Sequence, residues 1–138
     1  MGLIVNTTNN NLRVGVVLSS GGARGVYAHT GFLQALQKLE IKIVAIAGCS
    51  AGALVGGIYA SGTSLDQWAA VLANVHPRNF WRPDSMLRFL WNMTVRKGRG
   101  YTGLSETETA INFISQQLTA ETFAGCKIPF HSLAMNLT

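Results

Sequence analysis

The sequence is poor in charge and in cysteine. Only 12% of its 138 residues are charged, whereas 48% are hydrophobic. This balance excludes a disordered chain and is typical of a compact α/β domain with a buried sheet. The two cysteines, Cys49 and Cys126, have no C-x-x-C or zinc-ligand spacing. We therefore interpret them as reduced intracellular thiols and expect no metal site.

The sequence also lacks a recognisable signal peptide or convincing transmembrane helix. Residues 1–12 form a polar, Asn-rich segment without a positively charged start that leads into an apolar run. The 23 residues between Lys42 and Asp66 carry no charge, but their glycines and β-branched beginning favour a strand, a turn and a helix over a membrane span. We expect a cytoplasmic or peripheral membrane protein, and export by a route other than Sec stays open.

Acidic residues are scarce. Lys and Arg outnumber Asp and Glu by 11 to 6, and the net charge of +5 suits an anionic surface such as lipid or nucleic acid. Six of the basic residues lie in residues 76–101 among large aromatics. This segment is expected to be a basic-aromatic cap or loop insertion that contacts lipid headgroups, or else a solvated loop whose aromatics pack on the domain. No nucleic-acid-binding motif accompanies it, so no nucleic acid partner is expected.

Two glycine-containing turns each follow a short apolar run. The first turn, Ser20 to Gly25, follows a strand predicted over residues 13–19, and the second, Gly48 to Gly52, follows a strand predicted over residues 43–47. Helices are predicted at about 26–40, 51–61, 64–74 and 105–119, and a last strand at 126–136. A strand–helix–strand unit of this length indicates parallel strands, which places both turns at the same edge of the sheet.

The second turn has the sequence G-x-S-x-G, which between a strand and a helix is typical of a nucleophile elbow. Gly48 and Gly52 allow the sharp turn, and Ser50 is the candidate nucleophile. The first turn offers backbone N–H groups at the beginning of a helix, where negative charge is favoured. The candidate oxyanion-hole residues are Gly21, Gly22, Ala23 and Arg24.

Together these motifs resemble those of the patatin-like phospholipases, which have an oxyanion loop Gly-Gly-Gly-x-Arg/Lys-Gly and a later Gly-x-Ser-x-Gly. Ser20 occupies the position of the family's usual first glycine. The resemblance implies that residues 13–138 are the N-terminal portion of a single patatin-like α/β hydrolase domain, with a parallel-sheet core and flanking helices, incomplete at the C-terminus. It also implies a serine lipid acyl hydrolase of phospholipase A type, with a lipid or phospholipid substrate and no cofactor.

In the family, an aspartate in a later Asp-Gly motif takes the proton of the serine. Neither Asp66 nor Asp84 is followed by glycine here. We therefore expect the catalytic aspartate beyond residue 138, and expect these residues alone to be inactive.

Other functions stay open. Ser50, Asp84 and His131 occur in the order of a Ser-His-Asp esterase, although His131 falls in the middle of a predicted strand. A nucleotide-binding module would use the first turn as a phosphate cradle, but that turn matches neither common phosphate-loop pattern. A non-catalytic membrane-binding module is a further alternative. His29, on the apolar face of its predicted helix, is expected to be a packed, hydrogen-bonded histidine.

Overall fold

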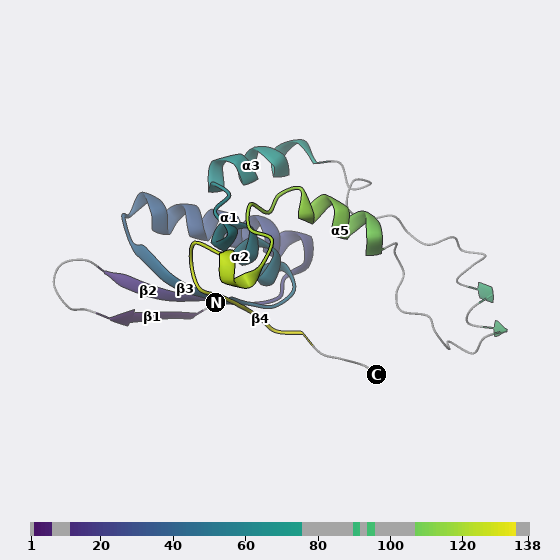
Figure 1. Ribbon diagram of the computed structural model, residues 1–138, viewed down its shortest axis with the longest axis horizontal. Coiled ribbons are helices and arrows are strands. Elements are labelled where there is room, and N and C mark those ends of the chain that lie inside the picture. The colour runs from purple at the N-terminus through teal and green to yellow at the C-terminus, as the bar shows by residue number, and fades with distance from the viewer. Residues whose placement is uncertain (1, 7–11, 76–89, 92–93, 96–106, 135–138) are drawn as a thin grey trace. The chain divides into compact units, whose positions relative to one another are not determined.

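The computed structural model describes residues 2–6, 12–75, 90–91, 94–95 and 107–134. These belong to two compact units, residues 1–73 with 117–138, and residues 74–116. The first unit contains the sheet and most of the described helices (Figure 1). In chain order the elements are β1 (Gly2–Asn6), β2 (Arg13–Leu18), α1 (Gly22–Lys38), β3 (Lys42–Gly48), α2 (Ala51–Ser61), α3 (Leu65–Asn74), α5 (Thr107–Ser115), the 3₁₀ helix η2 (Phe123–Gly125) and β4 (Phe130–Ser132).

The sheet has four strands in the order β1-β2-β3-β4. Strands β2, β3 and β4 are parallel to one another, with Val16 opposite Ile46 and Ile46 opposite Phe130. The predicted parallel-sheet α/β fold with flanking helices is therefore confirmed. Strand β1 pairs with β2 in the antiparallel direction, and the polar character of residues 1–12 gave no indication of this edge strand.

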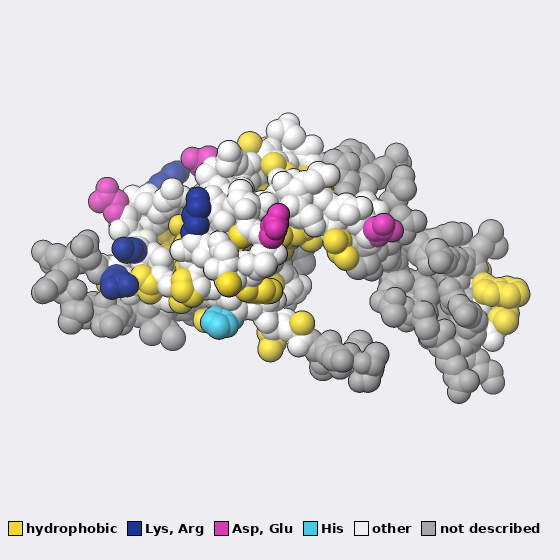
Figure 2. Space-filling view, in the orientation of Figure 1, with side chains coloured by type: hydrophobic (Ala, Val, Ile, Leu, Met, Phe, Trp, Pro, Cys, Tyr) yellow, Lys and Arg dark blue, Asp and Glu magenta, His cyan; other side chains and the backbone are white. Residues whose placement is uncertain are grey.

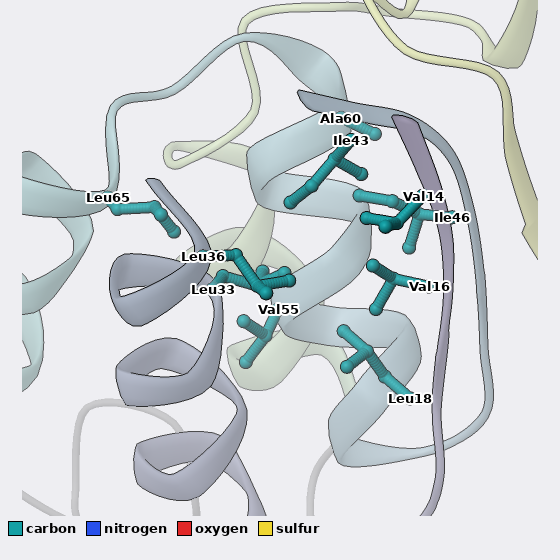
Figure 3. Packing of buried hydrophobic residues seen from close by; sticks show 10 residues of the cluster. All are labelled: Val14, Val16, Leu18, Leu33, Leu36, Ile43, Ile46, Val55, Ala60 and Leu65. Atoms are coloured by element: carbon teal, nitrogen blue, oxygen red, sulfur yellow. The ribbon is translucent and has the colours of Figure 1, made fainter. Parts of the chain in front are cut away.

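Helices α1 and α2 lie on the same side of the sheet (Figure 1). The side chains of β2 alternate accordingly, because Val14, Val16 and Leu18 are buried whereas Val17 is 46% exposed. Figure 3 shows the resulting core, to which both helices and the two central strands contribute. Each fully buried aliphatic side chain contributes about 1.5 to 3 kcal/mol. The cluster consists of Val14, Val16, Leu18, Leu33, Leu36, Ile43, Ile46, Val55, Ala60 and Leu65.

Helix α1 begins at Gly22, not near residue 26 as predicted from the sequence. The N–H of Gly25 donates to the carbonyl of Gly21 at 2.8 Å, so most of the predicted glycine loop is the first turn of the helix. At the other end, Glu40 adopts φ 55. The N–H of Glu40 donates to Gln37 O, and that of Ile41 to Leu36 O. This is the Schellman arrangement that ends a helix, with a non-glycine residue in the left-handed position.

The C-terminal prediction was too long, because β4 covers only Phe130–Ser132 and is preceded by η2. Most of the predicted cap at 76–101 lies outside the described residues, as does Ser105 of the predicted helix cap. Within that range the structure describes Leu90, Trp91, Thr94 and Val95, which are exposed. In the part of the chain that the structure describes, no helix is both long enough and apolar enough to cross a bilayer.

The glycines of α2 allow close packing against the sheet. A Cβ added at Gly56 would lie 2.9 Å from Cγ2 of Ile46 and 3.3 Å from the ring of Phe130. By contrast, a Cβ added at Gly31 of α1 would meet nothing within 4 Å. Glycine is intrinsically unfavourable in a helix. Of these two glycines, packing explains Gly56 but not Gly31.

Alanine substitution at these two glycines should therefore change stability in opposite directions. Gly56→Ala is expected to lower the free energy of unfolding by about 1 to 3 kcal/mol through overpacking. Gly31→Ala is expected to raise it by up to about 1 kcal/mol, because alanine favours the helix. Urea denaturation measures both, and equal effects at the two positions would contradict this account of α2.

Candidate active site

Ser50 lies between β3 and α2 with an unusual backbone conformation. Its φ and ψ are 52° and −123°, in a region that side-chain-bearing residues rarely adopt. Such conformations cost about 1 to 3 kcal/mol and occur most often at functional sites. The side chain is exposed and does not cap the helix that follows it. The sharp strand-to-helix turn expected from G-x-S-x-G is therefore present, with its serine hydroxyl accessible.

The glycines on either side of Ser50 are required by backbone contacts. A Cβ at Gly52 would lie 2.2 Å from the carbonyl oxygen of Leu18, and a Cβ at Gly48 would lie 2.6 Å from the carbonyl carbon of Gly52. Both distances are far below any real Cβ contact. The first turn of α2 therefore lies directly against the end of β2, and no side chain can be accommodated at either position.

Hydrogen bonds hold the elbow between the ends of its neighbouring strands. The N–H of Cys49 donates to Leu18 O at 3.1 Å, and the N–H of Leu133 donates to Gly48 O at 3.0 Å. Leu18 thus accepts the bond from Cys49 and also contacts Gly52. This role could not be predicted from the sequence, in which Leu18 is only the last apolar residue of a predicted strand.

The first turn of α1 supplies donors and positive charge. The N–H groups of Gly22, Ala23 and Arg24 have no acceptor within the helix, as is general for the beginning of an α-helix. All three residues are exposed. The turn contains no acidic residue, so no carboxylate within it offsets the charge of Arg24 or the positive end of the helix dipole. Gly22 has φ 56, a conformation that favours glycine.

A close contact brings this turn to the elbow. A Cβ added at Gly25 would lie 3.1 Å from Cβ of Ala51, the residue that follows Ser50. The contact is closer than most real Cβ contacts, so glycine at position 25 lets α1 approach the beginning of α2. Residues 21–24 and Ser50 therefore lie at the same edge of the sheet, as the parallel topology predicts.

The structure does not support a role for His131 in a triad. Phe130 packs against Gly56 and Gly57 of α2, and successive residues of a strand point to opposite faces, so His131 faces away from the helices. Among the described residues, no hydrogen bond joins His131 to Ser50. Asp84 lies outside the described residues. No group of three potential metal ligands occurs in the described part of the chain.

The basic residues of the described part do not form a single patch on the face in Figure 2. Lys and Arg side chains are separated from one another there, and acidic side chains lie among them. Hydrophobic side chains gather along the side where the strands lie. A groove of about 240 Å³ lies between α1 and α3, lined in part by Tyr27, Gln34 and Leu72, and Ser50 is not part of its lining.

The family model of the patatin-like phospholipases matches residues 16–136. This match covers both glycine turns, helices α1 and α2, strand β3 and the last three residues of β2. The chain therefore belongs to the patatin-like phospholipase family.

Individual relatives agree with this assignment. Lysophospholipase NTE1 of Cryptococcus neoformans is 55% identical over 53 residues, which are 38% of this chain and 3% of that protein. An uncharacterized NTE family protein of Mycobacterium tuberculosis is 56% identical over 57 residues, 41% of this chain and 15% of that protein. Lysophospholipase nte1 of Neurospora crassa is 34% identical over 90 residues, 65% of this chain and 6% of that protein. The matches thus span only a small part of each relative's length. No solved structure matches this chain.

The strain at Ser50 predicts a difference between two substitutions that both remove the hydroxyl. Ser50→Gly should be more stable than Ser50→Ala by about 1 to 3 kcal/mol, because only glycine adopts this φ and ψ without strain. Chemical denaturation of the two variants measures the difference. If they unfold at the same denaturant concentration, the backbone at position 50 is not strained.

Proposed function

We propose that this chain carries the nucleophile and the oxyanion hole of a serine lipid acyl hydrolase, which cleaves phospholipid or lysophospholipid esters in the manner of a phospholipase A. The observation that carries the proposal is the strained, exposed Ser50 at the edge where the first turn of α1 presents unpaired N–H groups. Family membership supports a lipid ester as substrate.

In the proposed reaction, Oγ of Ser50 attacks the ester carbonyl carbon and its proton passes to a general base. The carbonyl oxygen becomes an oxyanion, which accepts hydrogen bonds from the amides of Gly21, Gly22 and Ala23, and Arg24 adds positive charge. The intermediate collapses to an acyl-serine and releases the alcohol, which takes up the proton. Water then hydrolyses the acyl-serine to the fatty acid and restores the hydroxyl. No cofactor is needed.

The base in this proposal is an aspartate beyond residue 138. Serine needs a neighbouring base at neutral pH. Of the two aspartates in the sequence, Asp66 lies in α3 and its Oδ1 accepts a 3.4 Å hydrogen bond from Gln34 Nε2. It thus belongs to a contact between α1 and α3, not to the elbow.

Contact with a membrane through residues 76–101 stays a prediction that accompanies this proposal.

The alternative functions are less well supported by the geometry. A phosphate cradle would use the amides of α1, but it gives no reason for the strained, exposed serine next to them. A Ser-His-Asp esterase would need the imidazole of His131 on the same side as the elbow. A non-catalytic membrane-binding module would need neither the strain nor the free amides.

Ser50→Ala in the intact protein should abolish hydrolysis of lysophosphatidylcholine and covalent labelling by a fluorophosphonate probe. Both processes require the nucleophilic hydroxyl. Ser115→Ala is the matched control, because that serine is exposed in α5 and donates only to Ile111 O. Activity of Ser50→Ala within a few-fold of wild type would refute the proposed nucleophile.

Gly22→Ala should lower kcat by on the order of 100-fold, since it disfavours the positive φ that orients the amides of the turn. Gly22→Pro, which also locks φ at a negative value, should have at least as large an effect. Binding to phosphatidylcholine vesicles should persist in both variants. Gly31→Ala, in the same helix but in open space, serves as the control and should hydrolyse substrate normally.

Residues 1–138 expressed alone should show negligible turnover. Loss of a member of a serine hydrolase's catalytic group lowers kcat by on the order of 10⁴-fold. The comparison is with a protein that extends through the family's Asp-Gly motif, assayed on the same lysophospholipid. Full, Ser50-dependent activity from residues 1–138 would show that the base lies within them.

A further inference from the structure

His29 is a buried, polar side chain that the proposed reaction does not use. It lies in α1 one helical turn after Gly25 and is only 5% exposed. Its Nε2 lies 2.8 Å from the carbonyl oxygen of Ser19. A carbonyl oxygen only accepts hydrogen bonds, so Nε2 is the donor in this contact. Within the described part of the chain, Nδ1 is buried without a hydrogen-bond partner.

This arrangement is costly if His29 serves only to fill space. A buried polar atom without a hydrogen bond costs about 1 to 3 kcal/mol, and an aliphatic side chain at position 29 would avoid that cost. What an aliphatic side chain would lack is the donor at Nε2. The bond to Ser19 is therefore the property that distinguishes histidine from a simple core residue here.

The bond to Ser19 acts on the turn that leads into α1. Ser19 is the first residue after β2. Because a trans peptide is planar, with its C=O and N–H pointing in opposite directions, a fixed Ser19 carbonyl also fixes the direction of the Ser20 N–H. The hydroxyl of Ser19 donates to Ser20 O at 3.3 Å, which restrains the next peptide. The chain then reaches Gly21, the first of the candidate oxyanion residues.

The imidazole of His29 also lies near Gly25, at the other end of this turn. A Cβ added at Gly25 would lie 3.7 Å from Nε2 of His29, and one added at Gly21 would lie 2.6 Å from the Cα of Gly25. The ring therefore forms a hydrogen bond with the beginning of the turn and lies beside the space that a side chain at Gly25 would occupy. The side chain of His29 connects the end of β2 to the second turn of α1, and the turn with the candidate amides lies between these two points.

We propose that His29 is a positioning residue, whose Nε2–H group holds the Ser19–Ser20 peptide so that the amides of residues 21–23 converge on the oxyanion near Ser50. The catalytic part of this inference rests on the proposed function. The structural part, that the bond orders the turn between β2 and α1, does not depend on any reaction.

The test compares two substitutions of similar length and shape. In His29→Gln, the side-chain amide nitrogen can replace Nε2 as donor to Ser19 O, whereas His29→Met fills similar space with no donor. His29→Met should lower kcat on lysophosphatidylcholine by about 10 to 100-fold, because misplaced amides stabilise the oxyanion poorly. KM should stay within about threefold, since His29 is buried and is not expected to contact the substrate. His29→Gln should restore kcat to within about threefold of wild type.

Hydrogen exchange measured on the same intact proteins provides a readout independent of catalysis. The amide of Gly25, which donates to Gly21 O, should exchange faster in His29→Met than in wild type or His29→Gln, while the amides in the middle of α1 should be unchanged. Urea denaturation shows whether either variant is globally destabilised.

Equal kcat and equal exchange in the Gln and Met variants would overturn the positioning role, whether both resemble wild type or both are impaired. Ser50→Ala, assayed in parallel, distinguishes the two proposals. If hydrolysis does not depend on Ser50, the proposed function fails, and the exchange comparison still decides whether His29 orders the turn.

Discussion

The contact of Gly52 with the carbonyl of Leu18 is the constraint on which the arrangement of the site depends. It lets the backbone of α2 begin directly against the end of β2, and Gly48 then packs against Gly52 from the neighbouring strand. Ser50 lies between these contacts and has the strained conformation described above. The exposed serine thus lies in a closely packed turn between a strand and a helix, and not in a long loop.

The beginning of α1 also packs closely against the elbow. Gly25 allows a close approach to Ala51, and His29 connects the turn before α1 to the second turn of that helix. The two halves of the candidate site therefore belong to one packed unit. Gly25 and His29 therefore contribute both to the packing of the helix ends and to the position of the turn that carries the candidate amides. A substitution at either residue should affect both stability and the proposed chemistry.

Much of this could be predicted from the sequence, because the information is local. Short β-branched runs identified β2 and β3, and G-x-S-x-G identified the position of Ser50. The predicted beginning of α1 was wrong because the glycines were interpreted as a loop. The hydrogen bond from Gly25 N–H to Gly21 O shows that the helix already includes them. Strand β1 depends on its pairing with β2, the role of Leu18 on its contacts with Cys49 and Gly52, and the role of His29 on its bond to Ser19. Composition and periodicity do not encode these specific contacts between elements.

The chain holds two non-glycine residues at positive φ in its described part, and they lie at opposite ends of β3. Ser50 follows β3, whereas Glu40 precedes it, in the turn that ends α1. Strain at Ser50 is tied to the candidate nucleophile, but strain at Glu40 serves only to reverse the chain. An engineer seeking a more heat-resistant version could therefore relax the second position with glycine and leave the chemistry of the first untouched.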